Sequence, residues 1–172
     1  MIRKATINDI KPIMLIIHDA VNLLKTSNVN QWQQGYPNEE AFLHDIEKQT
    51  LWVIEKDEKI VGVWNLAMED DPTYKVIYEG KWLTENTPYM VIHRIAVKKE
   101  YYHQGIAQMM FNFSEEEACK HHFKSIRIDT HRLNQPMNSI LTKLGYIKCG
   151  IIHLGNFCND DQERVAYEKI IL

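Results

Sequence analysis

The residues best suited to do chemistry lie between positions 92 and 107, where the apolar run Ile92–Val97 leads through a short polar turn to Gly105. A long amphipathic helix is predicted directly afterwards, from about residue 104 to 121. The first amides of a helix have no intrahelical acceptor, and the positive end of the helix dipole adds to their attraction for anions. A glycine at this position lets the main chain approach a phosphate closely. The stretch therefore predicts an anion site built from the amides around Gly105.

His93 is the first candidate for a general base. An imidazole titrates near pH 6.5, so it can accept a proton at working pH. Strand alternation predicts that His93, Ile95 and Val97 share one face of the strand 89–97, with Arg94 and Ala96 on the other face. The alternative is a half-buried strand histidine that only bonds a neighbouring group.

Other polar residues are weaker candidates. Glu79, just before Gly80, is a second possible base, although a surface carboxylate is the ordinary interpretation. Asp129 and His131 lie at the carboxyl end of the next predicted strand and favour structural roles. No set of His, Cys, Asp or Glu has the spacing of metal ligands, so no metal is predicted.

Aromatic side chains are expected to form a substrate-binding wall or, alternatively, a dimer interface. The candidates for contact with the substrate are Trp32, Tyr36 and Tyr78, with Tyr74 and Trp82 nearby in the irregular segment 70–88. The acidic run Glu69–Asp71 would attract a cationic ligand, or would simply be a solvated turn.

Length and patterning predict one α/β domain over residues 1–172. Its expected core is a mixed, mostly antiparallel sheet of about seven strands, flanked by about four helices. Strands are predicted at 2–5, 51–56, 59–66, 89–97, 125–129, 146–154 and 164–171, and helices after a cap at Thr6 or Asn8 and at 38–48, 104–121 and 135–144.

Composition excludes several classes of protein. A formal net charge of -3 argues against a general nucleic-acid binder. The densest apolar run, Ile13–Ile17, is far shorter than the roughly 20 residues of a membrane span, and the N-terminus lacks the apolar segment of a signal peptide. Three cysteines without CxxC spacing suggest neither a disulfide framework nor a zinc site, so a cytoplasmic location is expected.

Two blocks of this sequence resemble the GNAT superfamily of acyl-CoA-dependent N-acyltransferases: Ile95–Ala107, with Gly105, and Asn134–Tyr146. The resemblance implies transfer of an acetyl group from acetyl-CoA to a primary amine, of a small molecule or a peptide, by direct attack. It implies that the main chain of Ile95 and Val97 pairs with pantetheine and that the amides of 103–108 cradle the pyrophosphate. The cofactor-binding residues expected on this basis are Ile95, Ala96, Val97, Tyr102, His103, Gln104, Gly105, Ile106, Ala107, Gln108, Asn134 and Lys143. A homodimer would be common among such proteins, and no nucleic-acid or membrane partner is implied.

This chain departs from the family pattern at two places. Tyr102 and His103 stand where the family usually has Arg-Gly, and Leu141 stands where many members carry the tyrosine that protonates the departing thiolate. Water, Tyr146 or Tyr101 would then have to serve. The departures keep open the alternative of a non-catalytic module of the same fold that binds CoA or a partner protein. His93 itself matches a histidine used as base in the similar arylalkylamine N-acetyltransferases.

Overall fold

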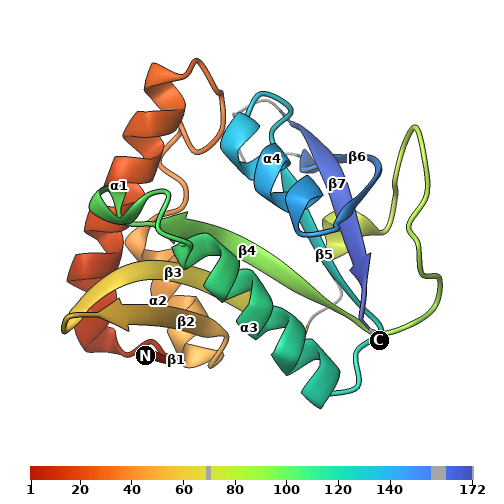
Figure 1. Ribbon diagram of the computed structural model, residues 1–172. Coiled ribbons are helices and arrows are strands. Elements are labelled where there is room, and N and C mark those ends of the chain that lie inside the picture. Colours follow the sequence, from red (N-terminus) through yellow and green to blue (C-terminus); the bar gives the residue numbers. More distant parts are fainter. Residues whose placement is uncertain (69–70, 156–161, 172) are drawn as a thin grey trace.

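One twisted sheet of seven strands runs through the protein in the order β1-β2-β3-β4-β5-β7-β6 (Figure 1). The computed structural model describes residues 1–68, 71–155 and 162–171. The strands are β1 (Ile2–Lys4), β2 (Leu51–Lys56), β3 (Lys59–Ala67), β4 (Tyr89–Val97), β5 (Ser125–Thr130), β6 (Ile147–His153) and β7 (Glu163–Ile170). β4 and β5 pair in parallel, whereas the other neighbouring strands pair antiparallel. The sheet is therefore mixed and mostly antiparallel, as predicted.

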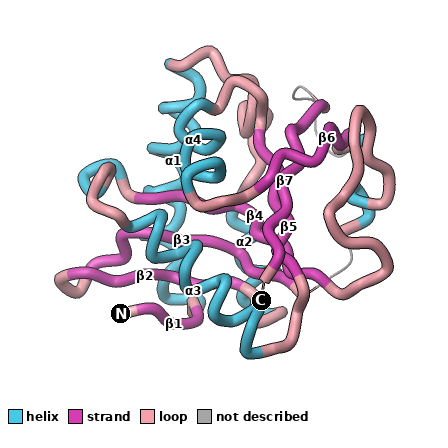
Figure 2. Tube along the Cα trace, turned by 45° about the vertical axis from the view of Figure 1, so that its right-hand side comes forward, coloured by secondary structure: helices cyan, strands magenta, loops and turns pink. Residues whose placement is uncertain are grey.

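Helices cover both faces of the sheet (Figures 1 and 2). They are α1 (Ile10–Thr26), α2 (Glu39–Glu47), α3 (Ile106–Lys120) and α4 (Gln135–Lys143), with the 3-10 turns η1 (Ile7–Asp9), η2 (Pro72–Tyr74) and η3 (Lys99–Tyr101). α3 and α4 bury apolar side chains against one face of the sheet, and α1 and α2 form a second apolar cluster on the opposite face. Within the described ranges, none of these helices has both the length and the apolar character that a membrane crossing needs.

Local signals set most element boundaries. Asn38 caps α2 by accepting a hydrogen bond from the Ala41 amide at 3.0 Å. Asp57 and Glu58 both have positive φ, which is the geometry of a type I′ hairpin between β2 and β3. Thr6 begins η1, which leads directly into α1, and Gly145 follows α4 with a φ of 82°. α3 starts at Ile106 instead of residue 104, because Gly105 takes the N-cap position in a left-handed conformation.

β4 and β5 separate after a short paired region. Their pairing covers Tyr89–Val91 on β4 and ends where Val91 faces Arg127. Beyond this point β4 continues to Val97 paired with β3, while β5 continues paired with β7. In Figure 1 the two strands diverge from a common end near the C-terminus. The edge of β4 from Ile92 onward is thus left without a strand partner on the β5 side among the described residues.

A β-bulge in β4 overturns part of the predicted strand alternation. Asn65 pairs with His93 and Val63 pairs with Ala96, so β4 carries one residue more than β3 between these pairs. Arg94 absorbs the extra residue with a φ of 51°. Ile95 and Val97 pack with the α3 cluster and Ala96 with the α1 cluster, as predicted. The prediction that His93 shares the face of Ile95 and Val97 was wrong, because the extra residue moves it to the face of Ala96.

Candidate active site

The turn before α3 presents unpaired main-chain amides. Gly105 has a φ of 78° and offers no side-chain cap to the helix. Met109 donates to the Gly105 carbonyl at 3.0 Å, whereas no acceptor is recorded for the amides of 103–108 within the described structure. A Cβ atom at Gly105 would meet no atom within 4 Å, so the space beside this turn is open. The structure therefore has the donors and the room that the anion hypothesis requires.

Side chains around the turn play different parts. Gln104 donates to the Glu100 carbonyl and accepts from Lys56 Nζ, so its side chain is tied to the turn itself. Lys56, at the end of β2, thereby brings a cation beside the open amides, and the sequence reasoning missed this residue. Burial raises the pKa of the neighbouring Tyr102 hydroxyl. His103 is exposed and has a φ of 60°, which shapes the turn.

Asn134 is engaged at both ends of its side chain. Its Oδ1 accepts from the Met137 amide at 3.3 Å and so caps α4. Its Nδ2 donates to Gln31 Oε1 at 3.2 Å. Lys143 lies exposed in the last turn of the same helix, at the opposite end from Asn134. Binding of CoA by these two residues stays a prediction.

His93 and Asp71 form a pair of titratable groups near the opening between β4 and β5. His93 Nε2 lies 3.1 Å from Asp71 Oδ2. Asp71 is also the N-cap of η2, where its Oδ1 accepts from the amide of Thr73 at 2.8 Å and from the Thr73 hydroxyl at 2.7 Å. Burial raises the pKa of Asp71, but the hydrogen bonds from His93 and Thr73 outweigh it and lower the pKa to about 2.

A second carboxylate lies close to this pair. The Tyr74 hydroxyl donates to Asp129 Oδ1 at 2.7 Å, and the rings of Tyr74 and His93 are 6.2 Å apart. Burial raises the pKa of Asp129, although the charge of His93 opposes that rise. Burial and the charge of Asp129 also raise the pKa of Tyr74 well above its ordinary value. The sequence placed Asp129 at the carboxyl end of β5 but gave no sign of its bond to Tyr74.

Glu79 and Tyr78 lie away from His93. Tyr78 forms an antiparallel bridge with Ile151 of β6, its ring contacts His153, and Glu79 beside it is exposed. β5 and β7 stand between β6 and β4 in the sheet. Tyr78 bridges the outer edge of β6, so four strand spacings of about 4.8 Å, or roughly 19 Å, separate the two candidate bases. The structure therefore does not bring Glu79 to the same site as His93.

The predicted aromatic wall is divided between surface and core. Tyr36 is exposed and accepts a hydrogen bond from Arg94 at 2.6 Å, and Trp32 on the same loop is half-buried against the α1 cluster. Tyr74 and Trp82 are only 1% and 9% exposed, so the expectation that they form an exposed acceptor surface was wrong. The Trp82 indole donates to the Tyr74 carbonyl, which explains why both rings pack inward.

The α4 side of the opening offers no hydroxyl at the expected position. Leu141 is completely buried in the main core. The Tyr146 ring packs against Phe111, and burial together with the charge of Glu115 raises the pKa of its hydroxyl well above the ordinary value. Such a buried phenol is a poor proton donor to a ligand.

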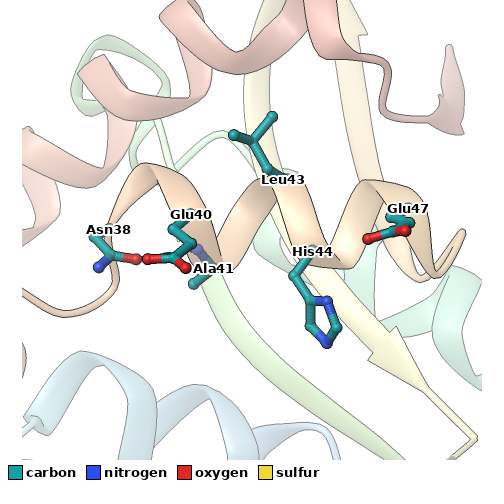
Figure 3. Close-up of a pocket in the computed structure, with 6 residues that line it drawn as sticks. All are labelled: Asn38, Glu40, Ala41, Leu43, His44 and Glu47. Carbon is teal, nitrogen blue, oxygen red and sulfur yellow. Dashed lines mark hydrogen bonds between the residues drawn. The ribbon is translucent and has the colours of Figure 1, made fainter.

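Figure 3 shows an open hollow elsewhere, on the outward side of α2. Its six lining residues all come from the segment 38–47. Because one short helix supplies the whole lining, the hollow is a surface depression and not a cavity between elements. None of His93, Asp71 and Asp129 lines it. No group of three or more potential metal ligands occurs among the described residues.

Comparison with known proteins agrees with this geometry. A sequence model of the acetyltransferase (GNAT) family matches residues 17–146. The crystal structure of a GNAT-family acetyltransferase from Streptococcus agalactiae is 35% identical, with a TM-score of 0.88 over 99% of this chain and 94% of that chain. A candidate acetyltransferase from Staphylococcus aureus is 27% identical, with a TM-score of 0.74 over 100% and 99% of the two chains. The search of curated proteins found no match.

A sheet that opens between β4 and β5, followed by free amides at α3, is the architecture of an acyl-CoA-dependent transferase. This chain belongs to the GNAT family of acetyltransferases, and both the predicted family and the predicted fold class are confirmed. The family uses acetyl-CoA. The PaiA N-acetyltransferase of Thermoplasma acidophilum, solved in complex with coenzyme A, has the same fold at 18% identity, with a TM-score of 0.69 over 99% of this chain and 98% of that chain.

The residues of this chain fit that cofactor. Amides without acceptors at 103–108 suit a pyrophosphate, and the open space at Gly105 leaves room for it. The free edge of β4 offers main-chain donors and acceptors to an extended ligand, in the manner of an added strand.

Proposed function

We propose that this protein transfers an acetyl group from acetyl-CoA to a primary amine, and that the amine attacks the thioester carbonyl directly. The observation that carries the proposal is the continuity of β4 with the α3 turn. An unpaired strand edge, the His93–Asp71 pair and the free amides around Gly105 follow one another along one segment of chain. These features suit a cofactor-binding site along β4 with a base beside it.

We assign to His93 the removal of a proton from the acceptor amine. An alkylamine with a pKa near 10.4 is almost fully protonated at pH 7, and keeping it neutral costs about 4–5 kcal/mol. The His93 imidazole accepts that proton, directly or through a water molecule, before the nitrogen attacks. The second proton, which the nitrogen loses as the amide forms, passes to the departing thiolate or to solvent. Bound acetyl-CoA supplies the activated acetyl thioester. The amides of 103–108 hold its diphosphate, and the main chain of Ile95 and Val97 aligns the pantetheine arm.

The departing thiolate does not require a protein acid. A thiol with a pKa near 8.5 leaves readily at neutral pH, and buried Leu141 and Tyr146 supply no accessible donor.

The acidic groups Asp71 and Asp129 favour a cationic acceptor, and the exposed Tyr36 ring is the proposed contact for its apolar part. We place the activity in the cytoplasm, where acetyl-CoA is available.

Calorimetric titration with acetyl-CoA, followed by thiol release with a panel of amines, tests this function. We expect micromolar binding, and thiol release only in the presence of a suitable amine. His93→Ala should lower turnover about 100-fold near pH 7 and leave acetyl-CoA affinity within twofold. His121→Ala removes an exposed histidine at the far end of α3 and should change neither quantity. Binding no tighter than millimolar would refute the proposal.

A second candidate function is a binding module that holds CoA or a partner protein without turnover. The observation that favours it is Leu141, which is buried where many related enzymes carry a tyrosine. Tight acetyl-CoA binding with no thiol release from any amine would identify this alternative.

A further inference from the structure

Asp71 is oriented from two sides. Its Oδ1 is occupied by the amide and hydroxyl of Thr73, whereas its Oδ2 is directed at His93. Pro72 at the start of η2 fixes the main chain beside it. The side chain of Asp71 is only 17% exposed, so little solvent competes for the carboxylate.

This arrangement determines which nitrogen of His93 carries hydrogen. An ionised carboxylate can only accept, so His93 Nε2 must donate to it. In the neutral ring the lone pair then resides on Nδ1. Protonation of Nδ1 produces an imidazolium that stays beside the negative charge of Asp71, and this favours the proton-accepting step.

Among the described residues, the other groups near the ring do not replace Asp71 as the acceptor of the hydrogen bond from His93 Nε2. Within the described residues, Tyr74 of η2 and Asp129 of β5 also face His93, and Arg164 of β7 lies close to Asp129. Tyr74 is already bonded to Asp129. On β4 itself, Arg94 is bonded to Asp45 of α2 and turned away from the imidazole.

We propose that Asp71 is the positioning residue for His93, and that it fixes the ring with Nδ1 as the proton-accepting atom. This inference rests on the proposed function for its catalytic meaning, but the pairing itself can be measured in the resting protein.

The test uses Asp71→Asn, which removes the charge while asparagine can still cap η2. Nuclear magnetic resonance of 15N-labelled histidine follows the titration of His93, which His93→Gln assigns. The wild-type spectrum should show the tautomer with hydrogen on Nε2. In Asp71→Asn the titration midpoint of His93 should fall by about one pH unit, because a negative charge beside the imidazolium is lost. Glu116→Gln removes an exposed carboxylate of α3 and should leave the midpoint unchanged.

The kinetic test compares the same variants with acetyl-CoA and the best amine found. Asp71→Asn should lower kcat about tenfold, while the KM for acetyl-CoA stays within twofold. The acidic limb of its pH–rate profile should move to lower pH together with the titration midpoint of His93. An unchanged His93 midpoint, or hydrogen on Nδ1 in the wild type, would overturn the inference. A shifted midpoint with an unchanged pH–rate profile would also overturn it. Absence of acetyl-CoA binding would instead refute the proposed function, because the histidine titration needs no turnover.

Discussion

Arg94 takes up the residue that β4 carries in excess of β3, and a left-handed φ at a non-glycine residue costs about 1–2 kcal/mol. Its guanidinium compensates for that strain. Nε and Nη2 donate to the two oxygens of Asp45 at 2.8 and 2.7 Å, and Nη1 donates to the Tyr36 hydroxyl. α2 and the loop before it therefore hold the bulge that sets the face of His93.

Arg94→Ala should lower the free energy of unfolding by about 3 kcal/mol, because it leaves the Asp45 carboxylate buried without its partner. Urea denaturation at neutral pH measures this change. Lys120→Ala, which removes the 69% exposed partner of Glu117, should change stability by less than about 1 kcal/mol. If the two variants lose equal stability, Arg94 does not hold the bulge.

The pKa of Asp71 predicts a contribution to acid stability. Its folded pKa of about 2 lies below the ordinary value of 3.8, so the folded state favours the ionised form. The contribution is therefore present above pH 4 and is lost as pH falls through 2. A difference of nearly two pH units corresponds to about 2 kcal/mol.

Urea midpoints of the wild type and Asp71→Asn between pH 2 and 6 test this prediction. The two proteins should differ most near pH 5 and converge towards pH 2. A difference that stays constant down to pH 2 would show that the lost stability does not come from the ionised carboxylate.

At the scale of elements, the position of α3 depends on a close approach to the sheet. Gly62 of β3 pairs with Val97 and lies under the first turns of α3. A Cβ atom there would lie 2.7 Å from Ile54 Cγ2 and 2.9 Å from Met110 Sδ. Only glycine lets the helix that carries the open amides lie so near the end of β4.

Gly62→Ala should therefore destabilise the protein by about 1–3 kcal/mol through overpacking, and it should weaken acetyl-CoA binding by displacing the start of α3. Urea denaturation and calorimetry measure the two effects. Gly145→Ala serves as control: its φ is 82° but its added Cβ meets no atom within 4 Å, so it strains the chain without moving α3. Equal acetyl-CoA affinity in the wild type and Gly62→Ala would contradict this account.

Features that depend on neighbouring residues are predictable from the sequence. The Asp57–Glu58 turn, the Asn38 cap and the glycine after α4 follow from local chemistry, and the strand–Gly105–helix segment was found in the same way. The bulge at Arg94 was not predictable, because it depends on the register between β4 and β3. The His93–Asp71 and Tyr74–Asp129 bonds join segments far apart in the chain. The local signals for Asp71 were the acidic run Glu69–Asp71, of which only Asp71 lies in the described residues, and the position before Pro72, typical of a helix N-cap.

At the scale of the whole molecule, the β4–β5 opening is fixed at its closed end by a buried polar network. Glu168 of β7 is fully buried and accepts hydrogen bonds from Ser125 and Arg127 of β5 and from Thr84. The Arg127 guanidinium also lies 3.8 Å from the centre of the Tyr89 ring at the start of β4. These contacts join β4, β5 and β7 where the two halves of the sheet meet, so a ligand can enter at the open end without separating them.

Because the buried network holds the opening in place in the folded protein, CoA should bind the folded state and raise its thermal stability. A ligand that binds only the folded state at 100 times its Kd adds about 2.7 kcal/mol to stability. For a chain of this size that corresponds to a rise in Tm of about 5–10 °C. We expect CoA to produce this rise in a thermal unfolding scan and Gly105→Tyr to abolish most of it, since a bulky side chain would occupy the open space beside the amides. Cys149→Ser changes a buried thiol away from the opening, so it should keep the CoA-induced rise whatever its starting Tm. An equal rise in the wild type and Gly105→Tyr would place the cofactor somewhere other than the turn before α3.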